Sequence, residues 1–547
     1  MATIVNRSFI VANGRSVHYR HAGPAGDAPP LILCHQSPKT SEELVPLLQD
    51  WGRYFHCYAP DSPGYGLSDP LPGKALALAD LADSVADFMD ALGLETAVIY
   101  GIHTGAKIAL GTAERHPDRV AGVVANGVLV NTPADRQDLA DRYLPPFKPS
   151  IDGAHMAMAW HRMRDQRVFF PWYDRRDAAR MPIDVSAPDD LQASVMDLFA
   201  AGDTYGAGYG AALSLNTRAL LARLTVPALI TCGPGDVLLE HLKNISAPDC
   251  VTVRGADSDA ALKTMAADFL KTHAPGATSP QAQPPAHGRR LRPTLRGEAG
   301  ARCHGLTGGR RAPDARRILV LPDLGGSVCT LRDVLEPLAS DMQILGLDPT
   351  GFGWSDADGG DPVAALDAAV GDFAPDAVVA HGLSAALALD WLAATDAPAK
   401  KLVLLDAVFP DDSLRPDIAT GLIPDLTPQA AGGHLLAAWQ AVRESALFYP
   451  WFRPVHAAAI PSDGKLVTGP LQQAAVALLR GWRTAQSLLP AALDAPSRLA
   501  GSGLDTVALV PDWSQGRGGL AALPAPVSCH PVAHADRPGA LRTALLA

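Results

Sequence analysis

An imidazole lies at the centre of a short glycine-flanked turn, Gly101-Ile102-His103-Thr104-Gly105. An apolar run precedes this turn and an Ala-rich stretch follows it, which predicts a strand, a tight turn and a helix. Turns with the related pattern G-x-S-x-G present a nucleophilic serine above a parallel sheet. The sequence thus places His103 where a hydroxyl group usually stands. An imidazole at that point could act as a general base near neutral pH.

Where a serine occupies such a turn, an acid and then a histidine follow it along the chain, and the histidine carries the proton. Here Asp236, in the loop Gly233-Pro234-Gly235-Asp236, fills the acid position, but Ala256 stands where the histidine is expected. The sequence therefore predicts a His103–Asp236 dyad in which the carboxylate orients the imidazole. His103 would act as general base, or alternatively as nucleophile. The opposing hypothesis is an inactive site that only binds a ligand.

Two segments supply candidates for an oxyanion hole. The backbone N–H of Thr104 follows the turn, and the loop around Gln36 and Ser37 follows an apolar run that reads as a strand. Backbone N–H groups at such places stabilise a developing negative charge, typically by about 3 kcal/mol per donor.

A segment further along the chain offers His155, Trp160 and Arg164 as candidate substrate-binding residues. His155 and Arg164 are nine residues apart, so a continuous helix would place them on nearly opposite faces and at most one could easily face a cavity. The alternatives are a core position for Trp160 and a salt bridge from Arg164 to Asp165.

A second possible site lies in the C-terminal half. Ser384 stands in Gly382-Leu383-Ser384-Ala385-Ala386, and His534 is at the position of the proton-carrying histidine. The acid partner is either Asp512 or Asp406. This half could be an ordinary serine esterase, or it could have become a structural partner in which the serine only packs.

The two halves of the chain repeat each other. The segment APDSPGYGLSD (59–69) matches LDPTGFGWSD (347–356), and YGIHTGAKIAL (100–110) matches AHGLSAALAL (380–389). A longer match joins residues 153–173 to residues 432–452 without a gap, so that each residue pairs with the one 279 positions later. A match of this length indicates a duplication.

A Pro/Ala/Gln/Gly-rich segment, residues 275–290, lies between the two halves and reads as a linker. It divides the chain into predicted domains at 1–274 and 291–547. In each domain short β-branched runs alternate with Ala/Leu-rich stretches, which predicts an α/β fold with a mostly parallel sheet flanked by helices. A helical insertion is expected at about 128–224 in the first domain and at about 408–500 in the second. The two halves are expected to pack against each other.

Four motifs in order resemble those of the α/β-hydrolase superfamily. They are the loop CHQSPKTS, the segment PDSPGYGLSD, the turn GIHTG and the loop GPGD. Each half of the chain resembles one complete domain, so the resemblance extends over nearly the whole chain. It implies a tandem duplication of the α/β-hydrolase fold, with each insertion forming a helical cap over an active site. This superfamily includes hydrolases, lyases, dehalogenases and inactive relatives, so the resemblance does not fix the activity.

The amino-acid composition argues against two classes of binding partner. Of the 547 residues 48% are hydrophobic and 19% are charged, and the net charge of −11 argues against nucleic acid or an anionic membrane as a partner. No signal peptide or membrane-spanning run is evident. The seven cysteines form no C-x-x-C pair, which is typical of reduced thiols in the cytoplasm. No dinucleotide fingerprint, P-loop or metal-ligand cluster appears, so we expect no cofactor and no metal.

The leading hypothesis is a cofactor-independent enzyme whose N-terminal half acts on a small carbonyl or carboxylate compound. With a base and an oxyanion hole, both hydrolysis and elimination are chemically open. The alternatives are a serine esterase in the C-terminal half and a non-catalytic binding or scaffold protein with two degenerate sites. A homodimer is possible in each case.

Overall fold

The computed structural model describes residues 3–24, 26–73, 75–278, 288–357, 360–461, 466–515 and 517–547. The chain divides into two compact units. The first comprises residues 1–148 and 158–286, and the second comprises residues 149–157 and 287–547. The division falls within the predicted linker, of which residues 279–287 lie outside the described part of the chain.

The first unit is built on an eight-stranded sheet of order β1-β2-β4-β3-β5-β6-β7-β8. The β1–β2 and β2–β4 pairs are antiparallel, and the remaining neighbours are parallel. Strands β3 and β7 are buried at every residue, as expected for parallel strands covered on both faces. The strands are β1 (Asn6–Ala12), β2 (Arg15–Ala22), β3 (Pro30–Cys34), β4 (His56–Pro60), β5 (Ala97–Ile102), β6 (Val120–Asn126), β7 (Ala228–Cys232) and β8 (Val251–Gly255).

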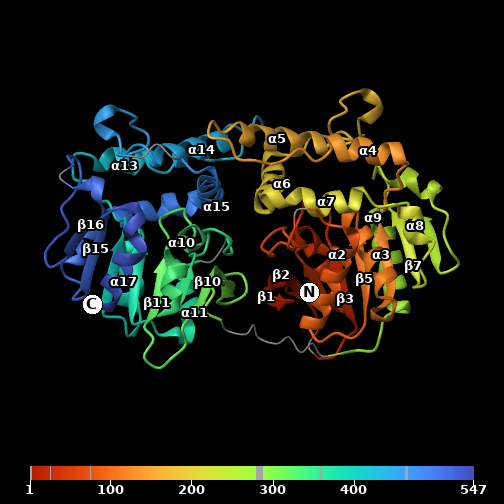
Figure 1. Cartoon of the computed structure of the whole chain (residues 1–547), viewed down its shortest axis with the longest axis horizontal. Coiled ribbons are helices and arrows are strands. Elements are labelled where there is room, and N and C mark those ends of the chain that lie inside the picture. The colour runs from red at the N-terminus through yellow and green to blue at the C-terminus, as the bar shows by residue number, and fades with distance from the viewer. Residues whose placement is uncertain are drawn as a thin grey trace. The chain divides into compact units, whose positions relative to one another are not determined.

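Helices cover both faces of this sheet (Figure 1). Apolar side chains of α2 (Leu78–Ala91), α3 (Thr104–Arg115) and α8 (Thr217–Leu221) join one core cluster. Those of α1 (Val45–Trp51) and α9 (Asp259–Thr272) join a second cluster. The sheet is thus the middle layer of a three-layer unit.

The chain between β6 and β7 forms a helical insertion. Its helices before α8 are α4 (Pro133–Arg142), α5 (Ala154–Gln166), α6 (Pro188–Ala201) and α7 (Tyr205–Leu213). Thr132 caps α4 by accepting the N–H of Asp135, whose carboxylate accepts the N–H of Thr132 in return. In the first unit α4, α6 and α7 lie beyond one end of the strands, where a cap was predicted (Figure 1).

The second unit repeats this design. Its sheet, read from β9, has the order β9-β10-β12-β11-β13-β14-β15-β16, in which the antiparallel pairs are again β9–β10 and β10–β12. This is the strand order of the first unit, so the tandem duplication of the fold is confirmed. The strands are β9 (Arg292–Arg296), β10 (Cys303–Gly309), β11 (Arg317–Leu321), β12 (Gln343–Leu347), β13 (Ala377–His381), β14 (Lys401–Leu405), β15 (Asp505–Pro511) and β16 (Ser528–Val532).

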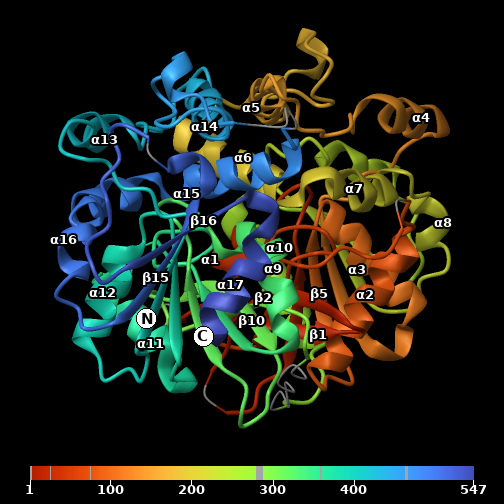
Figure 2. The same ribbon diagram turned by 60° about the vertical axis from the view of Figure 1, so that its left-hand side comes forward.

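The helices of the second unit also form two layers and an insertion. Apolar side chains of α10 (Arg332–Leu335) and α17 (Arg537–Leu546) share one core cluster. Helix α11 (Pro362–Val370) packs against α12 (Ala385–Ala394), which also contacts α16 (Ala495–Leu499) (Figure 2). Between β14 and α16 the insertion contains α13 (Arg415–Gly421), α14 (Gly433–Ser445) and α15 (Thr468–Leu493).

The repeated D-x-x-G-x-G segment encloses a buried carboxylate. Asp61 is 2% exposed and accepts the N–H groups of Ser41 at 2.8 Å and Leu67 at 3.1 Å. Its Oδ2 lies 2.8 Å from Nδ1 of His18. Gly66 has φ +54°, and a Cβ on it would lie 2.0 Å from Asp61 Oδ2. The aspartate and the last glycine of the motif are therefore a matched pair.

The same pair recurs in the second unit. Asp348 accepts the N–H of Val328 at 2.6 Å and the hydroxyl of Ser327 at 2.7 Å, and it contacts Nδ1 of His304 at 3.3 Å. A Cβ on Gly353 would lie 2.1 Å from its Oδ2. This explains why the motif is one of the clearest repeats in the sequence.

We expect Asp61→Asn to lower the free energy of unfolding of the first unit by about 3 kcal/mol, because a buried, hydrogen-bonded charge loses acceptors that nothing replaces. Urea unfolding followed by tryptophan fluorescence measures the loss. Asp348→Asn should act in the same way on the second unit, and Asp118→Asn, at an exposed position, is the control. Equal stabilities of Asp61→Asn and Asp118→Asn would contradict this role.

The same cluster makes the first unit sensitive to acid. Burial lowers the pKa of His18 to about 4 although Asp61 opposes the shift, whereas an unfolded histidine has a pKa of about 6.5. The unfolded chain therefore binds more protons, and the free energy of unfolding should fall by about 3 kcal/mol as the pH drops from about 6.5 to about 4. Unfolding curves measured across this range should show a smaller drop in His18→Gln, and an identical drop in both proteins would refute the assignment.

Candidate active site

A pocket of about 440 Å³ lies in the first unit. Its wall is formed by the loops that follow β3, β5, β6 and β7 and by residues of the helical insertion. These loops all leave the carboxyl ends of parallel strands, which is where open α/β sheets bind their ligands. The volume is sufficient for a small organic molecule, for which pockets are roughly 300–1,000 Å³.

His103 occupies a strained backbone position at the end of β5. Its φ is +50° and its ψ is −106°, a conformation that side chains other than glycine rarely adopt. Its N–H donates to the carbonyl of Asn126 at 2.8 Å, and α3 begins at the next residue. A Cβ on Gly101 would lie 2.1 Å from Gly105 O, and one on Gly105 would lie 2.1 Å from Cys34 O. Both glycines of the motif are therefore required by the turn.

The structure brings His103 and Asp236 together. Nε2 of His103 lies 2.7 Å from Oδ2 of Asp236, and both residues line the pocket. The other carboxylate oxygen of Asp236 accepts the N–H of Leu238 at 2.9 Å. Gly127 makes the contact possible, because a Cβ there would lie 2.3 Å from Cδ2 of the imidazole. The described residues offer Nδ1 of His103 no hydrogen-bond partner.

The electrostatics of this pair favour a charged carboxylate. Burial alone would raise the pKa of Asp236, but the hydrogen bond and the positive charge available from His103 outweigh it, so the pKa of this carboxyl lies below its usual range. Asp236 is therefore ionised at neutral pH and holds the Nε2 proton of the imidazole.

The candidate oxyanion donors lie together in the pocket wall but differ in their partners. The N–H of Gln36 donates to Glu43 Oε1 at 2.6 Å, and its side-chain amide donates to Oε2 at 2.7 Å. The N–H of Ser37 donates to the hydroxyl of Thr104 at 3.4 Å. The backbone N–H of Gln36 is thus bonded to a carboxylate, whereas that of Ser37 makes only a long hydrogen bond to a neighbouring hydroxyl in the pocket wall.

Glu43 is a site residue that the sequence did not reveal. Burial raises its pKa to about 7, while the two hydrogen bonds from Gln36 act in the opposite direction. Its neighbour Glu42 points away and pairs with Arg20. Adjacent identical residues with opposite roles carry no signal in the sequence.

Lys107 is the second site residue that sequence reasoning missed. It lines the pocket, is 3% exposed and donates from Nζ to the carbonyl of Ala212 at 2.8 Å. Burial, with a smaller contribution from Arg136, lowers the pKa of this amine to about 7. Its position four residues after His103, as the one charged residue between Thr104 and Ala113, was the available signal.

The three predicted substrate-binding residues are not among those lining the pocket. His155 belongs to the second unit, where its Nε2 lies 2.8 Å from Gln472 Oε1. Trp160 is fully buried. Arg164 forms an ion pair with Asp165 at 3.3 Å, which was the stated alternative to substrate binding. The insertion instead presents other side chains to the pocket, among them Tyr143 and Tyr209.

In the second unit, hydrogen-bond register identifies the residue that corresponds to His103. The N–H of His103, the first residue after β5, donates to the last residue of β6 at 2.8 Å. The N–H of Gly382, the first residue after β13, donates to the last residue of β14 at 2.8 Å. Gly382 also has a positive φ, +59°. Gly382 rather than Ser384 therefore occupies the turn.

Ser384 lies two residues further on and faces the sheet. Its side chain is 1% exposed, and its hydroxyl donates to His381 O at 2.8 Å and lies 3.4 Å from Leu321 O. Among the residues that the structure describes, it shares no hydrogen bond with His534. The structure does not bring the predicted serine–histidine pair together.

A carboxylate of the chain itself fills the space beside Gly382. Oδ1 of Asp323 accepts the N–H groups of Leu324 at 2.8 Å and Leu383 at 2.7 Å. A Cβ on Gly382 would lie 2.1 Å from Asp323 Cγ. These two N–H groups correspond in place to those of Ser37 and Thr104 in the first unit, so an anion already sits where an oxyanion would bind.

The two candidate acids of the second unit have different surroundings. Asp406 lies 2.9 Å from Nη2 of Arg537 and 3.4 Å from Nε2 of His381. Burial would raise its pKa, but these two neighbours lower it below its usual range. Asp512 is exposed and accepts the N–H of Trp513 at 2.8 Å. Asp406, unlike Asp512, is near enough to His534 to oppose the lowering of its pKa that burial and Arg537 cause.

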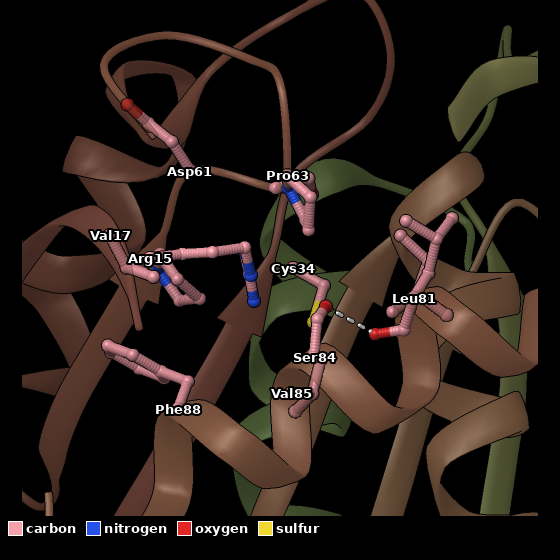
Figure 3. A pocket seen from close by; sticks show the side chains of 12 residues that line it. Arg15, Val17, Cys34, Asp61, Pro63, Leu81, Ser84, Val85 and Phe88 are labelled. Atoms are coloured by element: carbon pink, nitrogen blue, oxygen red, sulfur yellow. Dashed lines mark hydrogen bonds between the residues drawn. The ribbon is translucent and has the colours of Figure 1, made fainter. Parts of the chain in front are cut away.

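A second cavity in the first unit, of about 20 Å³, lies between the sheet and α2 (Figure 3). This volume has room for about one water molecule. Arg15 and Cys34 line it, and burial raises the pKa of the Cys34 thiol to about 12. A thiol held protonated in this way is a poor nucleophile, so Cys34 gives this cavity no nucleophile.

Within the described ranges, no group of three or more His, Cys, Asp or Glu side chains is placed to share a metal ion. The described helices also include none with both the length and the apolar character needed to cross a membrane.

The first unit is similar in sequence to known proteins. Residues 29–236 match the family model of the alpha/beta hydrolase fold. An uncharacterized hydrolase of Saccharomyces cerevisiae is 32% identical over 153 residues, 27% of this chain and 50% of the yeast protein. Haloalkane dehalogenase 2 of Mycobacterium tuberculosis is 34% identical over 122 residues, 22% of this chain and 40% of that enzyme. The (E)-2-((N-methylformamido)methylene)succinate hydrolase of Acinetobacter baylyi is 28% identical over 140 residues, 25% of this chain and 52% of that enzyme.

The chain thus spans about half, or less, of the length of these relatives. The match lies in the first unit, and the second unit has the same strand order. Residues 29–236 match the family model of the alpha/beta hydrolase fold and the second unit repeats the strand order of the first, so the chain carries this fold in two tandem copies.

Proposed function

We propose that this protein is a cofactor-independent hydrolase whose first unit attacks a small carbonyl compound, with His103 as general base and Asp236 as the group that orients it. The 2.7 Å contact between Nε2 of His103 and Oδ2 of Asp236 in the wall of a 440 Å³ pocket carries the proposal. Asp236 fixes the tautomer with the proton on Nε2, which leaves Nδ1 to accept a proton from water.

In the proposed reaction, Nδ1 of His103 takes a proton from a water molecule as its oxygen bonds to the substrate carbonyl carbon. The carbonyl oxygen becomes an oxyanion held by the N–H groups of Ser37 and Thr104. The imidazolium then gives its proton to the leaving group as the carbon–leaving-group bond breaks. Asp236 stays ionised throughout and stabilises the imidazolium.

The second unit supports the choice of Ser37 and Thr104 as oxyanion donors. There the equivalent N–H groups of Leu324 and Leu383 converge on one oxygen of Asp323. Two N–H groups that bind a carboxylate oxygen in one copy are suited to an oxyanion in the other. The same observation favours a structural role for the second unit.

We place the protein in the cytoplasm. All seven cysteines are free thiols, as is usual in a reducing compartment.

We expect His103→Ala and Asp236→Asn to lower kcat/KM for hydrolysis of short p-nitrophenyl esters by about 100-fold or more, since a base or its orienting partner is lost. Ser384→Ala, in the second unit, should leave the rate unchanged. Steady-state kinetics on the full chain measures this, with His103→Gln as a matched variant that keeps a polar side chain. Wild-type rates in His103→Ala would refute the assignment of the base. A product with a new double bond would indicate elimination.

A fluorophosphonate probe should leave Ser384 unlabelled, because this serine is buried against β11 and does not share a hydrogen bond with a histidine within the described residues. Intact mass measurement and peptide mapping of the treated full chain give the result. Porcine esterase treated in parallel shows that the probe is reactive. Stoichiometric labelling at Ser384 would mean that the second unit contains the serine site.

A further inference from the structure

Lys107 and His103 share one face of the pocket. The N–H of Lys107 donates to the carbonyl of His103 at 3.3 Å in the first turn of α3, and both side chains line the cavity. Residues four apart on a helix lie on the same side, about 6 Å apart along the axis. A ligand with two polar groups could therefore touch both residues at once.

The other basic groups of the pocket wall already have partners. Nζ of Lys39 lies 2.7 Å from the hydroxyl of Ser194 and 3.4 Å from a carboxylate oxygen of Asp197. Nε of Arg167 donates to the hydroxyl of Ser186 at 3.0 Å. Arg167 has no carboxylate at ion-pairing distance among the described residues, but its side chain is exposed and its charge is solvated by water.

Lys107 differs from Lys39 and Arg167 because it is buried and, in the part of the chain that the structure describes, no carboxylate neutralises its charge. Its Nζ can donate three hydrogen bonds, and the carbonyl of Ala212, in α7, accepts one of them at 2.8 Å. No carboxylate of the described residues lies at ion-pairing distance. A lysine that is 3% exposed and lacks a counter-ion is costly to bury, so the pocket is built for a ligand that supplies one.

We propose that Lys107 binds the carboxylate of the substrate, and that the substrates are short carboxylic acids bearing an ester or amide about one helical turn from that carboxylate. This proposal rests on the proposed function for the ester or amide end of the substrate, where His103 and the N–H groups of Ser37 and Thr104 act. Lys107 is then a positioning residue. Burial lowers the pKa of its amine to about 7, and a bound carboxylate would favour the ammonium form.

Binding of glutarate and of its uncharged counterpart glutaramide to the full chain tests this by isothermal titration calorimetry. We expect Lys107→Met to weaken glutarate binding at least tenfold, and glutaramide to bind the wild type at least tenfold more weakly than glutarate. Lys39→Met, which removes a lysine already paired with Asp197, should change the affinity less than threefold. In a His103→Ala background, Lys107→Met should weaken glutarate binding by a similar factor, so this result stands apart from the identity of the catalytic base.

A second measurement needs no variant at Lys107. At pH 8 the wild type should take up close to one proton on binding glutarate, as seen in buffers of different ionisation enthalpy, because the carboxylate restores the ammonium. Arg136 of α4 keeps its charge throughout. The other titratable groups of the pocket wall are His103, Asp236, Lys39, Tyr143 and Tyr209. Retention of the uptake in His103→Ala would assign it to Lys107.

Three results would overturn the proposal. One is the absence of glutarate binding to the wild type. Another is equal glutarate affinity in the wild type and in a folded Lys107→Met. The third is a borohydride-trapped adduct on Lys107 after incubation with a 2-oxo acid, which would make this lysine an imine-forming nucleophile instead.

Discussion

A left-handed backbone at a single residue determines where the groups of this site can lie. At φ +50°, His103 turns the chain from β5 directly into α3 and projects its side chain away from the sheet. A non-glycine residue there costs of order 1 kcal/mol or more and persists only where its surroundings enforce it. Here the bond to Asn126 O fixes one side, and two glycines allow the strand and the helix to approach on the other. The oxyanion candidate Thr104 and the buried Lys107 follow from the same turn, because both belong to the helix that it starts.

The two copies of the fold show how two exchanged residues change such a site. In the first unit a side chain stands at the turn and glycine follows the next strand, so the ring of His103 passes over Gly127 to reach Asp236. In the second unit glycine stands at the turn and Asp406 follows the next strand, also at a positive φ, +54°. The space left by the missing side chain is taken by Asp323. Strand order and turn geometry are retained, while the chemistry of the turn is lost.

Much of this could be predicted from the sequence, and the remainder could not, for physical reasons. Strand–helix alternation and the repeated motifs predicted two parallel sheets. The order of the GIHTG and GPGD motifs, with no histidine at the proton-carrying position, predicted that His103 meets Asp236. Ser384 was aligned with His103 because its surrounding residues resemble the motif, but it lies two positions beyond the turn. The backbone register places Gly382 in the turn. Glu43 and Lys107 were missed because burial depends on tertiary packing. The sequence cannot separate a buried Glu43 from an exposed Glu42, or show that Lys107 lies beneath α7.

The loss of the proton-carrying histidine has a direct consequence for the proposed chemistry. In a serine triad the imidazole stands between nucleophile and acid, so three side chains span the site. Here the strand register aligns Ser258, rather than Ala256, with His534, so that position again holds no histidine, and the imidazole at the turn reaches the acid without an intermediary. A dyad of this kind has no hydroxyl of its own to be acylated. The attacking oxygen must then come from water, and the substrate must be held in place without a covalent bond. Binding groups at the far end of the pocket therefore bear more of the positioning than they do in an enzyme that forms an acyl intermediate.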